Sequence, residues 1–125
     1  MIDTTAIDRW LATYVQAWKS DASEAVADLF EPDARYRTAP FRKPYVGHAA
    51  IVEWWIGKAE STIAWEFEYE VVAREGELYV VRGVTSYPHG AETPGAPVVF
   101  DNIWLVTLTA RGRAAEFVEY WMQRD

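Results

Sequence analysis

The first part of the chain carries apolar residues at helical spacing. From Asp3 to Ser20 they recur at steps of three and four residues, the period of one face of an α-helix. These residues are Ile7, Trp10, Leu11, Tyr14, Val15 and Trp18. A second helix is predicted from Ser23 to near Glu31, because the residue before Pro32 disfavours helical geometry. Residues 33–37 then indicate a short strand, and residues 48–58 a third helix.

Beyond residue 64 the period of the pattern falls to about two, which is typical of strands. From Trp65 to Val71, aromatic and aliphatic residues alternate with glutamates. One face of this strand is therefore predicted to be buried, and the acidic face to lie in solvent with Arg82 as a cross-strand partner. Turn residues separate three further strands, at residues 78–87, 98–109 and 114–122. Helices followed by antiparallel strands predict an α+β domain.

The last two strands form a hairpin whose register can be predicted. A loop of residues 110–112, with its glycine in the left-handed conformation, makes Thr109 and Arg113 the closing pair. Counting back from this pair places Asp101 and Glu119 on one face of the hairpin. The other members of that face are Val99, Ile103, Leu105, Phe117 and Trp121. A slip of one residue would move the assignment to the opposite face.

Both faces of the hairpin carry mainly apolar side chains. The second face is expected to hold Phe100, Trp104, Val106, Val118, Tyr120 and Met122. A sheet that is apolar on both sides needs a cover on each. We therefore expect the helices over one face and a second copy of the chain over the other, which makes the protein a homodimer through its outer sheet face.

Length and composition restrict the function. The 125 residues predict a single domain over residues 1–125, with a formal net charge of -7 and no cysteine. An acidic chain without a lysine and arginine stripe does not suit nucleic acid. The two histidines, His48 and His89, are far apart in sequence, so no metal site is expected. No long apolar segment or leader pattern is present, so we expect no membrane partner and a cytoplasmic protein.

Sequence motifs for two common classes of enzyme are absent. The chain has no glycine-rich phosphate loop and no nucleophile elbow of the type Gly-x-Ser-x-Gly. Nucleotide-dependent and serine-hydrolase chemistry are therefore disfavoured, and no cofactor is expected. Proton transfer and simple ligand binding remain.

Two carboxylates are the leading candidates for chemistry. Asp101 and Glu119 share a strongly apolar face in the predicted register, where an ionised group must be paired, hydrogen-bonded or altered in its pKa. The alternative is that each binds a turn backbone or an arginine such as Arg82 and has no catalytic role. On spacing alone the two interpretations are about equally favoured.

Further candidates surround the expected apolar site. Tyr14 lies on the apolar side of the first helix, where its hydroxyl could donate to a ligand oxygen or simply cap the core. His48 follows Gly47 at a helix start, and either binds ligand as a neutral base or caps the helix. The residues expected to shape the apolar walls are Trp18, Trp55, Phe117 and Trp121.

The pattern resembles the nuclear transport factor 2-like superfamily and, within it, the SnoaL-like group. The resemblance rests on the helix 10–18, the segment Leu29–Ala34, the helix entry Gly47–Ile51 and the closing strand Phe117–Trp121. It implies N-terminal helices packed on a strongly curved, mostly antiparallel sheet that forms a cone-shaped pocket. The superfamily includes isomerases, dehydratases, cyclases, hydrolases and transport factors, so the shared fold does not determine the reaction.

Comparison with the ketosteroid isomerase branch implies specific roles. Tyr14 is similar to its oxyanion tyrosine, and Asp101 to its protonated oxyanion carboxylic acid. The aspartate that moves the proton in that branch would fall near Ala39, where this chain has no base. Glu119 could supply a proton acceptor from another wall.

Two hypotheses follow for the function. The first is a cofactor-independent lyase or isomerase that works by proton transfer on a hydrophobic, oxygenated small molecule, with isomerisation, cyclisation or dehydration as the result. Tyr14, Asp101 and Glu119 would be its catalytic residues. The second is a non-catalytic module that binds a ligand or associates as a dimer. An open cavity with inward carboxylates favours the first hypothesis, and a cavity filled by aromatic rings favours the second.

Overall fold

The computed structural model describes residues 2–20, 22–58, 65–87 and 98–124. Within these residues the helices precede the long strands, as the change of period predicts. The helices are α1 (Thr5–Ser20), α2 (Ser23–Asp28) and α3 (His48–Lys58). The strands are β1 (Phe30–Arg37), β2 (Tyr45–Val46), β3 (Glu66–Glu75), β4 (Leu78–Tyr87), β5 (Val98–Leu108) and β6 (Ala114–Gln123).

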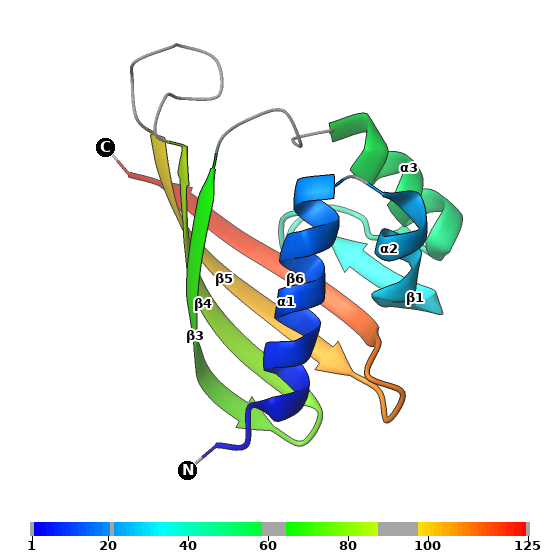
Figure 1. Ribbon diagram of the computed structural model, residues 1–125, viewed down its shortest axis with the longest axis horizontal. Coiled ribbons are helices and arrows are strands. Elements are labelled where there is room, and N and C mark those ends of the chain that lie inside the picture. The colour runs from blue at the N-terminus through cyan, green and yellow to red at the C-terminus, as the bar shows by residue number, and fades with distance from the viewer. Residues whose placement is uncertain (1, 21, 59–64, 88–97, 125) are drawn as a thin grey trace.

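The described strands form one sheet in the order β2-β1-β6-β5-β4-β3. From β3 to β6 the strands pair antiparallel with their sequence neighbours, whereas β1 runs parallel to β6. Figure 1 shows α1 lying across the long strands, with α2 and α3 beside it over the β1 end of the sheet. The predicted α+β architecture with a mostly antiparallel sheet is therefore confirmed.

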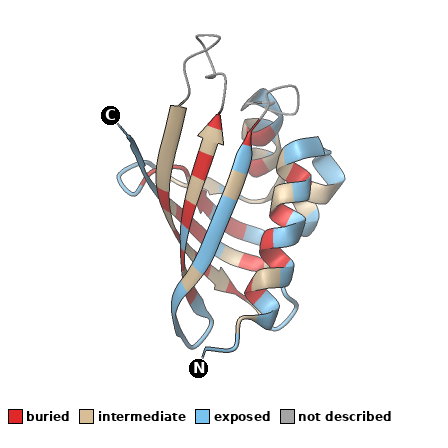
Figure 2. Cartoon of the chain, turned by 60° about the vertical axis from the view of Figure 1, so that its left-hand side comes forward, coloured by how far each residue is buried: buried red, intermediate tan, exposed pale blue. Residues whose placement is uncertain are grey.

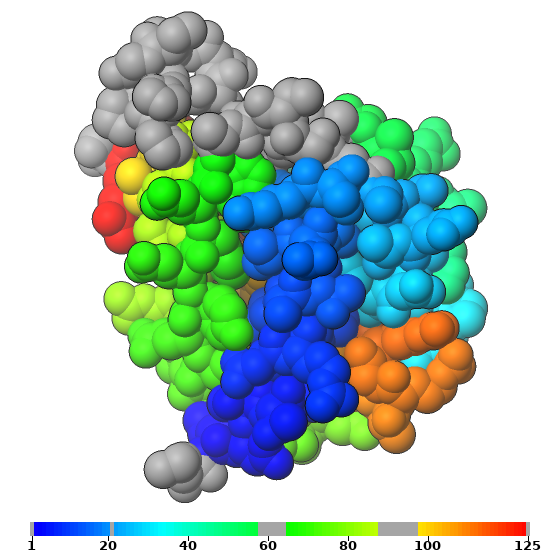
Figure 3. Space-filling model, in the orientation of Figure 1, coloured from blue at the N-terminus to red at the C-terminus, as the bar shows by residue number. Residues whose placement is uncertain are grey.

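Helix α1 covers one face of the sheet, which we call the inner face. The Thr4 hydroxyl donates to the Asp8 carboxylate at 2.7 Å, and this contact helps to fix the start of the helix. The apolar side of α1 packs on the sheet, with the ring of Tyr14 4.9 Å from that of Trp104. In the space-filling view the atoms of α1 lie between β3 and the segment that joins β5 to β6 (Figure 3).

Burial follows the same two layers. Figure 2 shows that the buried residues form one side of α1 and the bands of the sheet that face it. On β5 the even-numbered residues from 102 to 108 are buried and their odd-numbered neighbours are only partly covered. The inner face of the sheet is therefore the core of the molecule. None of the described helices is long and apolar enough to span a membrane.

The segment around Pro32 differs from the sequence prediction. The second helix ends at Asp28 rather than near Glu31, and β1 begins at Phe30 rather than at residue 33. Pairing with β6 draws Phe30 into the sheet opposite Ala114. The ladder is interrupted between Phe30 and Arg35, and Pro32, which has no N–H to donate, lies in this interruption.

The predicted register of the β5–β6 hairpin is right at its closed end and wrong beyond it. Thr109 N donates to Arg113 O at 2.8 Å, and Gly112 has a φ of 75°. The register then shifts between Thr107 and Leu108, so Asp101 faces Met122 instead of Trp121. Because one extra residue reverses every later side chain relative to its partner, Asp101 and Glu119 lie on opposite faces.

Gly83 on β4 provides space for an aromatic ring that supports the inner face. A Cβ atom at this position would lie 2.5 Å from Cε1 of Phe67, whose ring stacks on that of Trp104 at 4.9 Å and 15°. We expect Gly83→Ala to lower the free energy of unfolding by about 1–3 kcal/mol, because the ring must move within a packed core. Urea denaturation followed by circular dichroism measures this change.

Gly57 on α3 supplies the matched control, because a Cβ atom added there meets nothing within 4 Å. Gly57→Ala is expected to be neutral or to stabilise by about 0.5–1 kcal/mol, since alanine is the better helix former. Equal stability of Gly83→Ala and the unchanged chain would contradict the role given to Gly83.

Candidate functional site

A cavity of about 330 Å³ lies at the inner face of the sheet. Nine of its fourteen lining residues are aromatic, so its walls are largely apolar. Helices α1 and α3, strands β1, β4, β5 and β6, and the segment after β1 all contribute to it. The lining residues are Tyr14, Trp18, Tyr36, Thr38, Arg42, Trp54, Trp55, Thr85, Tyr87, Phe100, Asn102, Trp104, Glu119 and Trp121.

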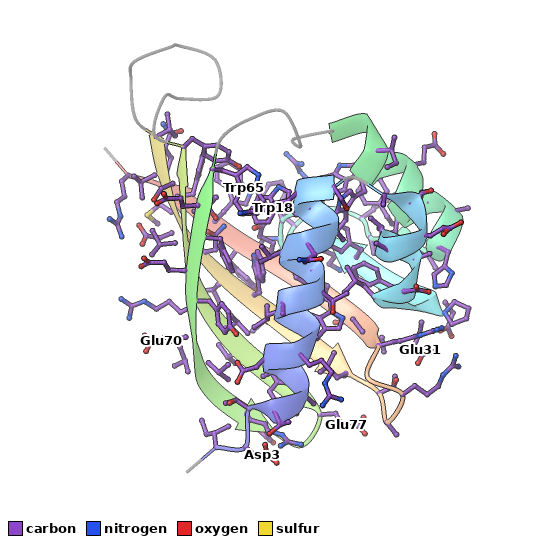
Figure 4. The ribbon with its side chains drawn as sticks, viewed as in Figure 1. Asp3, Trp18, Glu31, Trp65, Glu70 and Glu77 are labelled. Carbon is purple, nitrogen blue, oxygen red and sulfur yellow. The ribbon has the colours of Figure 1, made fainter. Side chains whose placement is uncertain are left out.

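Packed rings hold the aromatic wall in place. Tyr14 lies 4.9 Å from Trp55 and 4.9 Å from Trp104, both measured between ring centroids. At the end of α1, Trp18 stacks on Trp65 at 3.9 Å and 25° (Figure 4). Such contacts add to the stabilisation that burial alone gives. The wall is therefore assembled from both layers of the fold.

Glu119 is the carboxylate that the cavity wall contains. Its Oε2 atom accepts hydrogen bonds from Nδ2 of Asn102 at 3.0 Å and from Nε1 of Trp104 at 2.8 Å. Asn102 is held in turn by the Thr85 hydroxyl, which donates to Oδ1 at 2.9 Å. Hydrogen bonds to a carboxylate favour its ionised form and offset the cost of removing it from water. These four residues join β4, β5 and β6 at one point of the wall.

Two tyrosine hydroxyls lie together on the side of the cavity formed by α1 and β1. The hydroxyl oxygens of Tyr14 and Tyr36 are 3.0 Å apart, so one donates to the other. Both side chains are buried, at 5% and 2% exposure. Phenolic hydroxyls in an apolar site can donate to an oxygen on which charge develops.

One cation also lines the cavity. Arg42, in the segment between β1 and β2, donates from Nη1 to Oγ1 of Thr38 at 3.3 Å. Its guanidinium carbon lies 5.9 Å from the ring centroid of Phe41, which is 82% exposed. Arg42 itself is exposed, so this side of the cavity is open to solvent.

Most of the residues that the sequence suggested for the site lie on the cavity wall. They are Tyr14, Trp18, Trp55, Glu119 and Trp121. Phe117 lies behind the wall: it is fully buried and stacks on Tyr36 at 4.9 Å and 24°. It therefore supports the lining residues without forming part of the lining.

Asp101 is outside the cavity, contrary to the expectation that it shares a face with Glu119. It lies on the outer face of the sheet, where Arg124 donates to its two carboxylate oxygens at 2.7 and 2.8 Å. These hydrogen bonds lower the pKa of Asp101 below its usual value of 3.8. Asp101 is therefore ionised at neutral pH and cannot act as a protonated oxyanion donor in the cavity.

His48 also lies away from the lining residues. Its Nε2 donates to the backbone carbonyl of Phe30 at 2.6 Å, because a carbonyl oxygen can only accept. This contact ties the start of α3 to β1. Ala39 is 2% exposed and is not a lining residue, whereas the preceding Thr38 is. His89 lies outside the described residues. Across the described ranges, no three His, Cys, Asp or Glu side chains gather as they would around a metal ion.

Several polar residues of the wall were not among the candidates from the sequence. Asn102 and Thr85 were both passed over, and the predicted register puts the even-numbered residues of β5 on the face opposite Glu119. A polar side chain inside an otherwise apolar strand is the signal that could have identified both. Thr38 and Arg42 follow β1 in a proline-containing segment, and loops next to strands often carry functional residues.

The Asp101–Arg124 pair generates a prediction about acid stability. Because the folded-state pKa of Asp101 is lowered, the pair stabilises the fold above pH 3.8, and this contribution is lost as the pH falls through the folded-state value. Asp101→Asn is therefore expected to be slightly less stable than the unchanged chain at pH 7, with a smaller difference at pH 2. The two side chains are 46% and 55% exposed, so the effect is small.

Urea denaturation at the two pH values measures this difference. The same variant is expected to leave reactions in the cavity unchanged, because Asp101 lies on the other side of the sheet. A stability difference of equal size at both pH values would contradict the assignment of the effect to the ion pair.

Comparisons with known proteins agree with this architecture. The model of the SnoaL-like domain family matches residues 11–117. No curated protein is similar enough in sequence to count as a relative. Solved structures do match the fold, and among them is the epoxide hydrolase/cyclase-like enzyme SalBIII, which has a role in pyran ring formation in the polyether salinomycin. SalBIII has a TM-score of 0.74 and 18% sequence identity, over 98% of this chain and 95% of its own.

Two further solved structures are similar. A protein from Shewanella putrefaciens CN-32, described as a SnoaL-like polyketide cyclase, has a TM-score of 0.72 and 17% identity over 91% of this chain and 78% of its own. A ketosteroid isomerase-like protein from Erwinia carotovora atroseptica SCRI1043 has a TM-score of 0.66 and 20% identity over 94% and 95%. At these identities the likeness shows the fold and leaves the reaction open.

Proposed function

The chain belongs to the SnoaL-like domain family, and we propose that it is a cofactor-independent enzyme in which Glu119 moves a proton on a bound small molecule. The ligand is a hydrophobic, oxygenated compound that fits the aromatic cavity. The reaction is an isomerisation, a cyclisation or a dehydration, each of which begins with removal of a proton.

The observation that carries this proposal is the position of Glu119. A carboxylate on a mostly aromatic wall is costly to place unless it is hydrogen-bonded, and Asn102 and Trp104 both donate to Glu119. Glutamate side chains are seldom found in the apolar interior of a small domain. A carboxylate held in an apolar cavity is the arrangement that general base catalysis uses.

The cavity also offers groups for the charge that proton removal creates. When Glu119 takes a proton from a carbon next to a carbonyl, the electron pair moves onto the carbonyl oxygen. The hydroxyl pair of Tyr14 and Tyr36 lies on the same cavity, and binding of a substrate lets one hydroxyl of the pair turn its hydrogen to that oxygen. In an isomerisation, Glu119 then returns the proton to another carbon. In a cyclisation, the electron pair forms a ring bond to a second carbonyl carbon, whose oxygen takes the proton from Glu119, and in a dehydration it expels a hydroxide, which leaves as water with that proton. All three reactions use the same base and differ only in which atom receives the electron pair.

The comparisons support this class of reaction without identifying the substrate. The similar structures include proteins described as an epoxide hydrolase/cyclase-like enzyme, a polyketide cyclase and a ketosteroid isomerase-like protein. These descriptions refer to hydrophobic, oxygenated compounds or to ring formation. They fit a cavity in which aromatic walls contact the ligand and a few polar groups orient it.

A chromogenic probe tests the base without knowledge of the natural substrate. In 5-nitrobenzisoxazole, a base removes the proton on carbon 3, the N–O bond breaks and a coloured cyanophenolate is released. We expect Glu119→Gln to reduce the rate with this probe by about 10²–10⁴-fold, because an amide cannot accept the proton. Absorbance of the phenolate at neutral pH measures the rate.

Glu116→Gln is the matched control, since Glu116 is an exposed carboxylate on the same strand. It is expected to keep the full rate. Tyr14→Phe is expected to reduce the rate with the probe by less than Glu119→Gln does, because it removes a donor to the developing phenolate oxygen and leaves the base in place. Equal rates for the unchanged chain and Glu119→Gln would contradict the proposed function.

As a second candidate function, we propose that the outer face of the sheet binds a second copy of the chain. Tyr120 and Met122 on this face are 44% and 72% exposed. Strand β3, at one edge of the sheet, carries the exposed residues Glu66, Glu68 and Glu70. Strand β1, near the other edge, carries Arg35 and Arg37. A two-fold axis parallel to the strands places the acidic edge of one copy against the basic edge of the other.

Tyr120→Lys tests this association. A lysine in the centre of a paired apolar face is desolvated without a partner. We therefore expect the dissociation constant of the dimer to rise by at least about 10-fold. Ile56→Lys changes an exposed apolar residue on α3 instead and is expected to leave the dimer intact. Sedimentation velocity measures both variants. An unchanged chain that sediments as a monomer would contradict the proposal.

A further inference from the structure

The arginine on the open side of the cavity points to the class of ligand. We propose that the ligand is a hydrophobic carboxylic acid, whose carboxylate binds the guanidinium of Arg42 while its apolar body lies against the aromatic wall. This inference rests on the proposed function, and it deepens that function by narrowing a hydrophobic, oxygenated compound to an organic monoanion.

Arg42 is held in place by its own segment. Its backbone N–H donates to the oxygen of Ala39 at 3.1 Å and closes a turn over residues 39–42. Nη1 of Arg37 donates to the backbone oxygen of Arg42 at 2.7 Å, and Nη1 of Arg42 donates to Oγ1 of Thr38 at 3.3 Å. Thr38 is only 6% exposed, so the acceptor is fixed by its packing. A guanidinium held in this way loses less conformational freedom on binding a ligand than a freely moving side chain does.

The guanidinium of Arg42 forms no ion pair with the residues that the structure describes. In that part of the chain the arginines in ion pairs are Arg82, Arg111 and Arg124. A guanidinium has several N–H donors, and the contact with Thr38 uses only one of them. Arg42 therefore presents a positive charge and further donors to a ligand that enters the cavity.

Glu119 lines the same cavity, but it is not the partner of Arg42. Its Oε2 atom accepts hydrogen bonds from Asn102 and Trp104, and no ion pair joins it to Arg42 within the described residues. The positive charge of Arg42 therefore stays available to an anionic group that the ligand itself brings.

The charges of the cavity favour a carboxylate over a phosphate. Arg42 is the one cation among the described lining residues, and Glu119 is the one carboxylate. A carboxylate carries a single charge, and its two oxygens match the planar fork of a guanidinium. A phosphate dianion would bring a second negative charge to a mostly aromatic cavity that already contains Glu119. The formal net charge of the chain, -7, disfavours it further.

Two probes of matched shape test this inference on the full chain. 2-Naphthoic acid is a carboxylate at pH 7, and 2-naphthamide has the same rings with a neutral group of similar size. We expect the unchanged chain to bind 2-naphthoate at least about 10-fold more tightly than 2-naphthamide, because only the carboxylate forms charge-assisted hydrogen bonds with Arg42. Isothermal titration calorimetry at low ionic strength measures both dissociation constants.

Substitutions of Arg42 assign the preference to its side chain. Arg42→Gln is expected to raise the dissociation constant of 2-naphthoate by about 10-fold and to leave that of 2-naphthamide within about twofold. Arg42→Lys keeps the charge and loses the planar fork, so its affinity for 2-naphthoate is expected to lie between the two. Because Arg42 is exposed, both variants are expected to keep the circular dichroism spectrum of the unchanged chain.

Lys43→Gln is the matched control. It removes the same charge from the next residue, which is exposed and does not line the cavity, so the preference for 2-naphthoate is expected to remain. An equal loss of preference in Lys43→Gln and Arg42→Gln would assign the effect to the general charge of this surface and overturn the inference. Equal dissociation constants of the two probes for the unchanged chain, or no binding of 2-naphthoate, would overturn it as well.

Failure of the proposed function gives a different result. The binding measurement needs no turnover, whereas the role of Glu119 is measured by the rate with 5-nitrobenzisoxazole. Equal rates for the unchanged chain and Glu119→Gln, together with a preference for 2-naphthoate that Arg42→Gln removes, would reject the base and support the ligand class. A large loss of rate in Glu119→Gln with equal binding of the two probes would support the base and overturn the ligand class.

Discussion

Strands β5 and β6 change register at a single point, and the contents of the cavity depend on that change. Leu108 pairs with Ala114, whereas Thr107 pairs with Glu116, so Ala115 is an extra residue in the ladder. Every residue of β6 beyond it pairs one position further along β5. The bulge therefore aligns Glu119 with Trp104 on the inner face and turns Asp101 towards solvent on the outer face.

The aromatic wall and the hydrogen bonds to Glu119 from Asn102 and Trp104 depend on each other. The rings of Tyr14, Trp55 and Trp104 hold one another in place from α1, α3 and β5. Between these elements they leave a cavity rather than a filled core. A carboxylate in such a setting needs donors that do not move, and strands supply more precise positions than loops. The fold thus joins an open space to a rigid polar contact at the centre of its sheet.

Much of this architecture could be predicted because it follows from local pattern. The helical spacing from Ile7 to Trp18 and the alternation after Trp65 locate α1 and β3, and α3 spans the predicted residues. Phe30 and Glu31 were assigned to a helix end because parallel pairing with β6 cannot be seen in a local window. Strand pairing across the fold overrode the local signal there.

The site was predictable only in part, because strand pairing cannot be seen in a local stretch of sequence. Tyr14, Trp18 and Glu119 lie on the cavity wall, as their own elements indicate. Asn102 shares a face with Glu119 only because of the bulge at Ala115. Nothing in the sequence around this small residue indicates that the register will shift there. Because Ala115 is unpaired, Asn102 faces the cavity, and Asp101, which resembled a catalytic group, faces away from it. Trp104 both fills the core and donates to Glu119, so a substitution there alters the packing of the sheet and the cavity wall together. Arg42 lines the same cavity from an exposed position, so a substitution there alters the cavity and leaves the core intact.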